Sequence, residues 1–69
     1  QNLAVAYLEG KGVPRSVVQA YMWFNLCAAQ GDEKAVRGRD LTAETMTSSQ
    51  IEKAQDLARE CLKKGYKDC

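Results

Sequence analysis

Hydrophobic residues recur along the chain at intervals of three and four positions, and no segment alternates in the manner of a β-strand. This period predicts four helices, at about residues 1–9, 17–30, 33–45 and 48–64. Gly10, Gly31 and Gly65 follow the first, second and fourth of these segments, and glycine tolerates the left-handed conformation that ends many helices. The chain is therefore predicted to be all-α.

Three of the predicted helices begin with recognisable capping residues. Ser16 is followed by Gln19, and Thr47 by Gln50, at the spacing of a capping box, in which each side chain bonds to the other residue's backbone N–H. Asp32 is predicted to be the N-cap of the third helix. These signals place the starts of the second, third and fourth helices.

The second predicted helix is apolar nearly all round. Between residues 17 and 30, the plainly polar residues are Gln19, Asn25 and Gln30. A surface helix has a wide polar face, so this helix is expected to be covered on more than one side. Gly38 lies inside the third helix at a cost of about 1 kcal/mol relative to alanine, and we expect it to serve close packing against a neighbour.

Composition narrows the range of functions. The chain has 69 residues, a net charge of +1 and no histidine, so it forms at most one small domain and has no histidine-based triad or zinc site. Near-zero charge argues against a nucleic-acid-binding module, and no apolar run is long enough for a membrane span. No phosphate-binding loop is present. We expect no catalytic residue, no cofactor and no metal.

The second half of the chain resembles the first at an offset of 34 residues. This offset aligns Ala20 with Ala54, Trp23 with Leu57, Cys27 with Cys61 and Gly31 with Gly65. A period of 30 to 40 residues made of paired helices is typical of solenoid proteins, whose terminal repeats are atypical.

These residues resemble the Sel-one-like repeat (SLR), a relative of the tetratricopeptide repeat. The match covers residues 3–31 and Ala35, with an alanine at position 4 and Cys27 standing where the family has glycine and alanine. The motif residues that carry it are Leu3, Tyr7, Gly10, Gly12, Val13, Ala20, Trp23, Ala28 and Gly31.

The resemblance implies two helical hairpins, with a Sel-one-like repeat at 1–31 and a degenerate C-terminal capping repeat with a short tail at 32–69. It implies a non-catalytic scaffold, from the C-terminal portion of a bacterial protein, that binds a partner protein or peptide. Because the chain begins with glutamine, we expect it to be cut from something longer. The residues expected to contact the partner are Asn2, Val5, Glu9, Tyr21 and Asn25.

Other interpretations stay open at this point. Tyr7 and Trp23 fit either the core of a hairpin or anchors for a partner, and Asn25 fits either a clamp on a peptide backbone or a side chain in water. The chain could also be a small envelope or secreted enzyme or enzyme modulator that uses carboxylates, or a purely structural cap. Exposed apolar helix faces would also suit a homo-oligomer.

The three cysteines allow an intramolecular disulfide, a cross-link between two chains through Cys69, or three reduced thiols. Cys61 and Cys69 flank Gly65, which permits the tail to fold back into a disulfide, and cysteine-rich relatives of the repeat bridge helices at a similar spacing. A disulfide would indicate the bacterial periplasm or secretion. Three reduced thiols would indicate the cytoplasm. Cys27 is expected to pack as a small hydrophobic residue.

Overall fold

The computed structural model describes residues 2–67 and 69. The described residues form no strand, and their helices are α1 (Asn2–Glu9), α2 (Val17–Ala29), α3 (Glu33–Ala43) and α4 (Ser48–Lys63). The prediction of an all-α fold of about four helices is confirmed.

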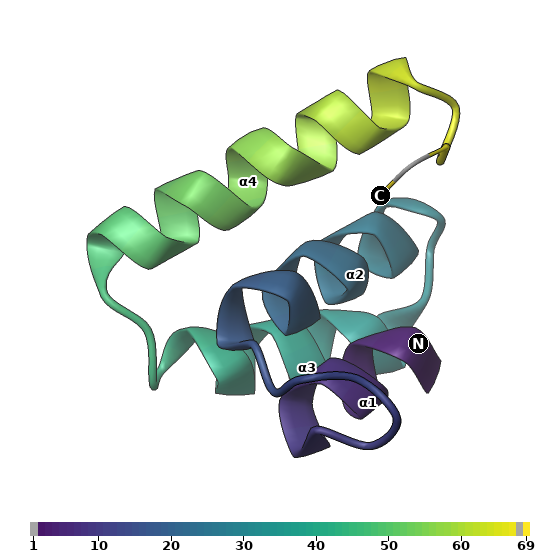
Figure 1. Ribbon diagram of the computed structural model, residues 1–69. Coiled ribbons are helices and arrows are strands. Elements are labelled where there is room, and N and C mark those ends of the chain that lie inside the picture. The colour runs from purple at the N-terminus through teal and green to yellow at the C-terminus, as the bar shows by residue number, and fades with distance from the viewer. Residues whose placement is uncertain (1, 68) are drawn as a thin grey trace.

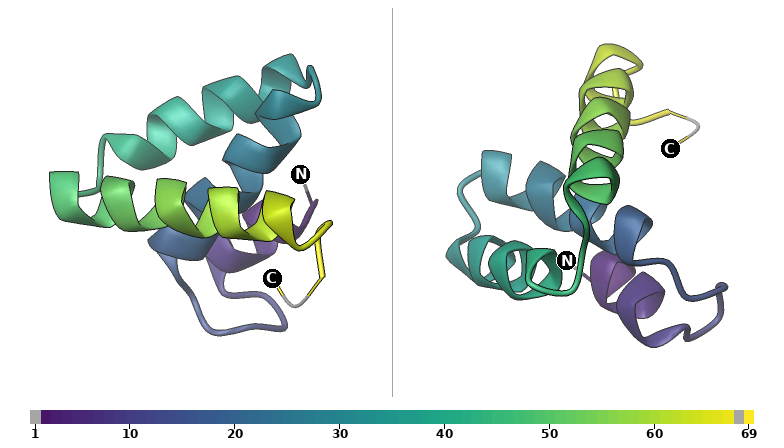
Figure 2. Two further views of the ribbon diagram at one scale, coloured as in Figure 1. Left: turned by 90° about the horizontal axis from the view of Figure 1, so that it is seen from above. Right: turned by 90° about the vertical axis from the view of Figure 1, so that its left-hand side faces the viewer.

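Helix α2 lies at the centre of the molecule and packs against each of the other three helices. In Figure 1, α4 lies above α2 and α1 lies below it. The right-hand view of Figure 2 shows α1 and α3 together on one side of α2 and α4 on the opposite side. Two packing surfaces therefore meet along one helix.

The first packing surface joins α2 to α1 and α3. Its buried members are three alanines and one aromatic residue: Ala4, Ala20, Phe24 and Ala35. All three alanines have no exposed surface, so the helix backbones approach closely at these points. Half-buried side chains complete this first core, and they are Tyr7, Leu8, Trp23, Cys27 and Ala28.

The second packing surface joins α2 to α4. Its buried members are Met22, Leu26, Ala58 and Cys61, and the half-buried Trp23, Leu57 and Cys69 pack against them. Trp23 contacts both cores. The expectation that the second helix is covered on more than one side is confirmed.

The two halves of the chain differ in how their helices pair. Helices α1 and α2 pack extensively on each other, whereas α3 and α4 each pack extensively on α2 and share little surface between themselves. The left-hand view of Figure 2 shows α3 and α4 joined at one end and diverging from that point. The second hairpin is thus spread over two sides of α2.

The predicted caps of α3 and α4 are confirmed. The Asp32 carboxylate accepts hydrogen bonds from the backbone N–H groups of Lys34, at 2.9 Å, and Ala35, at 3.3 Å. At α4 both halves of the capping box form, because Thr47 Oγ1 accepts from the Gln50 N–H at 3.2 Å and Gln50 Oε1 accepts from the Thr47 N–H at 2.9 Å.

The capping box predicted at the start of α2 is half wrong. Ser16 Oγ accepts from the Gln19 N–H at 3.1 Å, as expected. The return bond is absent because the Ser16 N–H donates instead to the Tyr7 carbonyl, at 2.9 Å, which closes the loop between α1 and α2. The Gln19 side chain is left without that partner, and its buried Oε1 accepts no hydrogen bond among the described residues.

Gly38 provides the close packing that its position predicts. A Cβ atom built on Gly38 would lie 2.5 Å from Cε1 and 2.7 Å from Cζ of the Phe24 ring. Such distances are far below van der Waals contact, so the ring of Phe24 occupies the space that any side chain at position 38 would need. Glycine here fixes how closely α3 approaches α2.

We therefore expect Gly38→Ala to lower the free energy of unfolding by about 1–3 kcal/mol, the usual cost of overpacking, despite the higher helix propensity of alanine. Denaturant unfolding followed by circular dichroism measures this. The same substitution is also made in a Phe24→Leu background. There we expect a smaller loss, because the smaller side chain at position 24 makes room for the methyl group of the alanine. Equal losses in both backgrounds would contradict a steric origin.

Candidate functional site

An apolar cavity of about 220 Å³ lies between the C-terminal end of α1 and α3. We call it the α1–α3 cavity, and its lining residues are Leu8, Arg15, Gly38, Leu41, Thr42 and Thr45. Leu41 is 65% exposed, the largest exposed fraction among the large hydrophobic residues of the described chain. A leucine so placed, beside a cavity, is available to an external apolar group.

The polar groups around this cavity bond to the chain itself. Thr42 Oγ1 donates to the Gly38 carbonyl at 2.7 Å, and Thr45 Oγ1 donates to the Thr42 carbonyl at 2.8 Å. Arg15 Nε donates to the Leu8 carbonyl at 3.0 Å. Since these donors have acceptors within the chain, the cavity offers mainly apolar contact.

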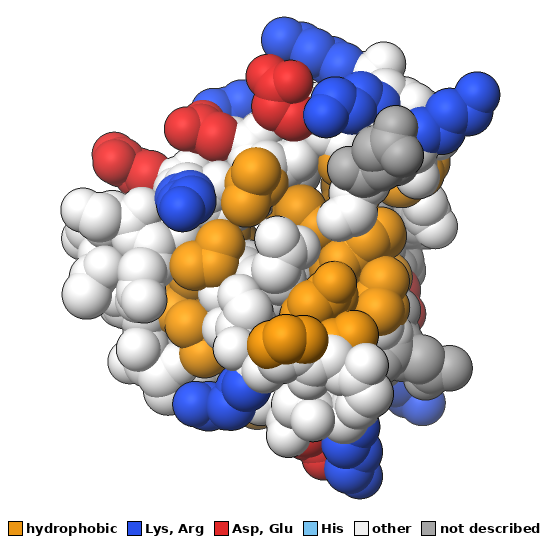
Figure 3. Space-filling view, viewed as in Figure 1, with side chains coloured by type: hydrophobic (Ala, Val, Ile, Leu, Met, Phe, Trp, Pro, Cys, Tyr) orange, Lys and Arg blue, Asp and Glu red, His pale blue; other side chains and the backbone are white. Residues whose placement is uncertain are grey.

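Other exposed hydrophobic side chains form two groups. Leu3 and Val5 lie on α1 and are 41% and 39% exposed, while Leu62 and Tyr66, at the end of α4, are 48% and 44% exposed. Figure 3 shows charged side chains gathered over α4 and hydrophobic side chains gathered below them, in the middle of the same face. On this face, charged side chains therefore border an apolar area.

The predicted partner-contact residues do not form one cluster. Val5 and Glu9 are exposed on α1, and Glu9 lies 3.6 Å from the Lys11 ammonium group in an ion pair. The side chain of Asn2 lies outside the described residues. Whether Val5 and Glu9 contact a partner stays a prediction.

One of the two candidates on α2, Tyr21, lies differently from what was expected. Tyr21 was expected at the surface, and this is wrong, since only 7% of it is exposed. Its helix is covered on opposite sides, which leaves little surface for a residue between them. Asn25 is half-buried, and its Oδ1 accepts from the Arg39 guanidinium group at 3.4 Å, so the amide links α2 to α3.

Most of the motif residues have the expected structural roles. The first core includes Tyr7, Ala20, Trp23 and Ala28, Val13 is half-buried, and the positive φ angles of Gly10, Gly12 and Gly31 are 72°, 78° and 94°.

Leu3 is the exception among the motif residues. It was expected on the buried stripe of the first helix, and this is wrong, because α1 turns Ala4 and Leu8 toward α2 instead. These two residues are four apart and so share one face of the helix, which leaves Leu3 at its margin.

The lining of the α1–α3 cavity was missed from the sequence. Leu41 lies off the apolar stripe of the third helix. An apolar residue outside the stripe was the one feature of the sequence that could have indicated a binding surface here. Arg15, Thr42 and Thr45 have no distinguishing pattern, because their role depends on the tertiary approach of α1 to α3.

Cys61 and Cys69 form a disulfide bond, with their Cα atoms 5.6 Å apart. The tail reverses direction at Gly65 and Tyr66, whose φ angles are 64° and 67°, and Tyr66 Oη accepts from Gln30 Nε2 at 3.0 Å. The bond between residues 30 and 66 and the disulfide together attach the tail to α2 and α4. Cys27 is half-buried in the first core, outside this disulfide.

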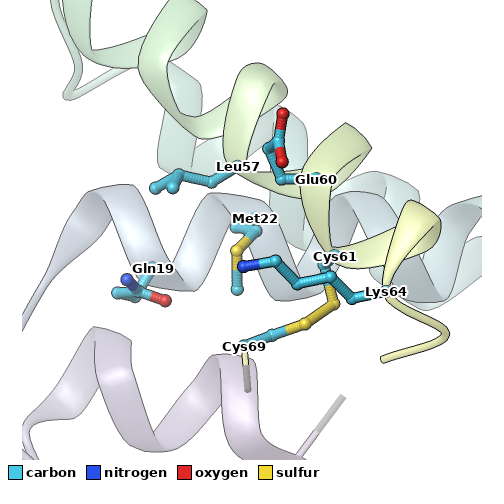
Figure 4. Close-up of a pocket in the computed structure, with 7 residues that line it drawn as sticks. All are labelled: Gln19, Met22, Leu57, Glu60, Cys61, Lys64 and Cys69. Carbon is cyan, nitrogen blue, oxygen red and sulfur yellow. A yellow bond between two sulfur atoms is a disulfide. The ribbon is translucent and has the colours of Figure 1, made fainter. Parts of the chain in front are cut away.

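A second cavity of about 170 Å³, the disulfide cavity, lies where α2, α4 and the tail meet. Figure 4 shows its lining residues, which are Gln19, Met22, Leu57, Glu60, Cys61, Lys64 and Cys69. This cavity has one acidic and one basic side chain in its lining, Glu60 and Lys64, whereas the charged residue that lines the α1–α3 cavity is Arg15.

Residues 2–67 and 69 contain no group of three or more His, Cys, Asp or Glu residues that could hold a metal ion. None of their helices combines the length and the apolar character needed to cross a bilayer.

Comparisons with protein-family models, with curated proteins and with solved structures found no match.

The disulfide closes a short loop, and removing it should lower the free energy of unfolding by about 2–3 kcal/mol. We expect Cys69→Ser to show this loss in denaturant unfolding without reductant, because the tail of the unfolded chain regains its freedom. In excess reductant the variant and the original chain should be equally stable. Intact mass measurement provides the control: a native chain with the mass of the fully reduced form would contradict the bond.

Proposed function

We propose that the chain is a non-catalytic protein-interaction module of the Sel-one-like type, which holds a partner protein or peptide on its helix surfaces. The observation that carries this proposal is Leu41, which is 65% exposed at the edge of the apolar α1–α3 cavity. Apolar surface beside a cavity is what protein partners bury, and residues in such pockets supply most of the binding energy.

The chemistry of the cavity suits a hydrophobic side chain of the partner. Arg15 Nε and the hydroxyl groups of Thr42 and Thr45 donate to carbonyl groups of the chain. An inserted apolar side chain would therefore leave none of these groups newly unsatisfied. Val5 and Glu9, exposed on neighbouring α1, would provide an apolar and a charged contact at the rim.

The repeat assignment has structural support. Ala20 and its counterpart Ala54 are both fully buried, and Gly31 and its counterpart Gly65 both have positive φ angles. Two of the four aligned pairs therefore share burial or backbone conformation, whereas Cys27 is half-buried and its counterpart Cys61 is buried in the disulfide. This supports our proposal that the halves are two repeats, of which the second is degenerate.

A second candidate function is that of a structural cap, and the outer face of α4 favours it. The exposed charged residues of α4 are Glu52, Lys53, Asp56, Arg59, Glu60 and Lys63, and Asp56 forms an ion pair with Arg59. A terminal helix of a solenoid has such a polar outer face because no further repeat covers it. This role is compatible with partner binding on the opposite side.

The disulfide supports a location in the bacterial periplasm or outside the cell. Disulfides persist in oxidising compartments and are rare in the cytoplasm. Cys61 is 1% exposed, so the bond is well shielded from reductants on that side. We propose this location over the cytoplasmic alternative.

Selection from a random-peptide phage library tests the interaction proposal. We expect enriched peptides to contain an apolar residue and to lose at least tenfold in affinity for Leu41→Glu, because a carboxylate at that position cannot accept apolar contact. Fluorescence anisotropy with synthetic peptides measures the affinities. Leu41 is mostly exposed, so circular dichroism should show an unchanged fold.

Leu62→Glu is the matched control, since Leu62 is 48% exposed on α4, away from the α1–α3 cavity. It should leave peptide binding unchanged. A library that yields no binder, or peptides that bind both variants equally well, would contradict the proposed surface.

A further inference from the structure

Arg15 is the only charged side chain among the described residues that line the α1–α3 cavity. We propose that it pairs with an acidic side chain of the partner, so that the cavity takes a peptide segment in which an aspartate or glutamate directly neighbours the inserted apolar residue. This inference rests on the proposed function, because it names the chemistry of the partner that the Leu41 surface binds.

Three contacts hold Arg15 at the edge of the cavity. Its Nε donates to the carbonyl of Leu8 at 3.0 Å, and Leu8 is itself a lining residue. The Ser16 N–H donates to the Tyr7 carbonyl at 2.9 Å, which ties the backbone beside Arg15 to the end of α1. A Cβ atom built on Gly10 would lie 3.3 Å from the Arg15 Cβ atom, so this stem is closely packed. Arg15 therefore loses less side-chain freedom on binding an anion than an unattached arginine would.

The same guanidinium group keeps the donors that a carboxylate needs. The bond to Leu8 uses the Nε–H and leaves the terminal NH₂ groups, and a guanidinium fork binds carboxylates through such parallel N–H donors. Arg15 forms no ion pair with a described residue, whereas Lys11, Arg39 and Arg59 pair with acidic neighbours. Arg15 is therefore available to an acid of the partner.

The acidic residues of this region lie outside the cavity lining. Those next to a lining residue in the sequence are Glu9, Asp40 and Glu44. Glu9 pairs with Lys11 at 3.6 Å, and Asp40 pairs with Arg39 at 3.4 Å. Glu44 forms no ion pair with a described residue, and its exposed carboxylate on the side of α3 disfavours a polyanion. The charges therefore suit a partner segment with a single carboxylate.

The exposure of Leu41 favours an internal segment over the end of a chain. Because Leu41 is 65% exposed, most of its side chain lies outside the cavity. A segment that continues past the inserted residue covers this apolar surface, whereas a chain that ends there leaves part of it in water. The carboxylate is therefore expected from an acidic side chain of the partner.

The test titrates the intact oxidised chain with three N-acetylated, C-amidated tripeptides and follows backbone amide shifts by NMR. They are Glu-Leu-Gln, Gln-Leu-Glu and the neutral Gln-Leu-Gln, whose blocked ends leave the glutamate side chain as the only carboxylate. We expect one acidic peptide to shift the amides of the cavity residues and to bind about fivefold more tightly than the neutral peptide, the upper range for an exposed ion pair. Arg15→Gln should remove this preference and leave the affinity for the neutral peptide unchanged, whereas a structural defect would weaken all three peptides.

Arg37→Gln provides the control, since Arg37 is an exposed arginine of α3 that does not line the cavity. It should keep the preference for the acidic peptide. Equal affinities for acidic and neutral peptides, or the same loss of preference in both arginine variants, would overturn the inference. If Leu41→Glu still weakened binding of all three peptides, the proposed function would stand. No shift of any cavity amide up to the solubility limit would also overturn the inference, and the phage selection would then decide the proposed function separately.

Discussion

The fold depends on burying a helix that has no adequate polar face. Helix α2 places Phe24 in one core and Met22 and Leu26 in another, on different sides. Water on either side would expose large apolar side chains, at roughly 1.5–3 kcal/mol each. The other three helices are arranged to prevent this: α1 and α3 cover one side and α4 covers the other. Both cavities lie at the edges of these two contacts.

Much of this architecture could be predicted because it is encoded locally. Asp32 and Thr47 cap their helices through residues two or three positions away, and Gly38 signals close packing because glycine is otherwise unfavourable in a helix. Features that depend on tertiary approach were not accessible. The burial of Tyr21 and the loss of the Gln19 capping bond both follow from contacts between helices, which periodicity within a single helix does not encode.

The two cavities differ in chemistry because they use polar groups differently. Around the α1–α3 cavity, Arg15, Thr42 and Thr45 bond to backbone carbonyls and leave an apolar surface. The lining of the disulfide cavity includes an acidic and a basic side chain, Glu60 and Lys64, and Gln19, whose Oε1 has no hydrogen-bond partner among the described residues. The first cavity is therefore lined mainly by apolar surface, and the second by a mixture of polar and apolar groups. A chain this small thus has two chemically distinct surfaces.

Trp23 belongs to both cores of the molecule. Its indole packs against the residues that α1 and α3 bury on one side of α2 and against those that α4 buries on the other, and its buried Nε1 has no hydrogen-bond partner among the described residues. A change in how α1, α3 or α4 packs against α2 therefore alters the environment of this one ring. The same ring is the chain's one tryptophan, so its intrinsic fluorescence reports the packing of both cores without any label.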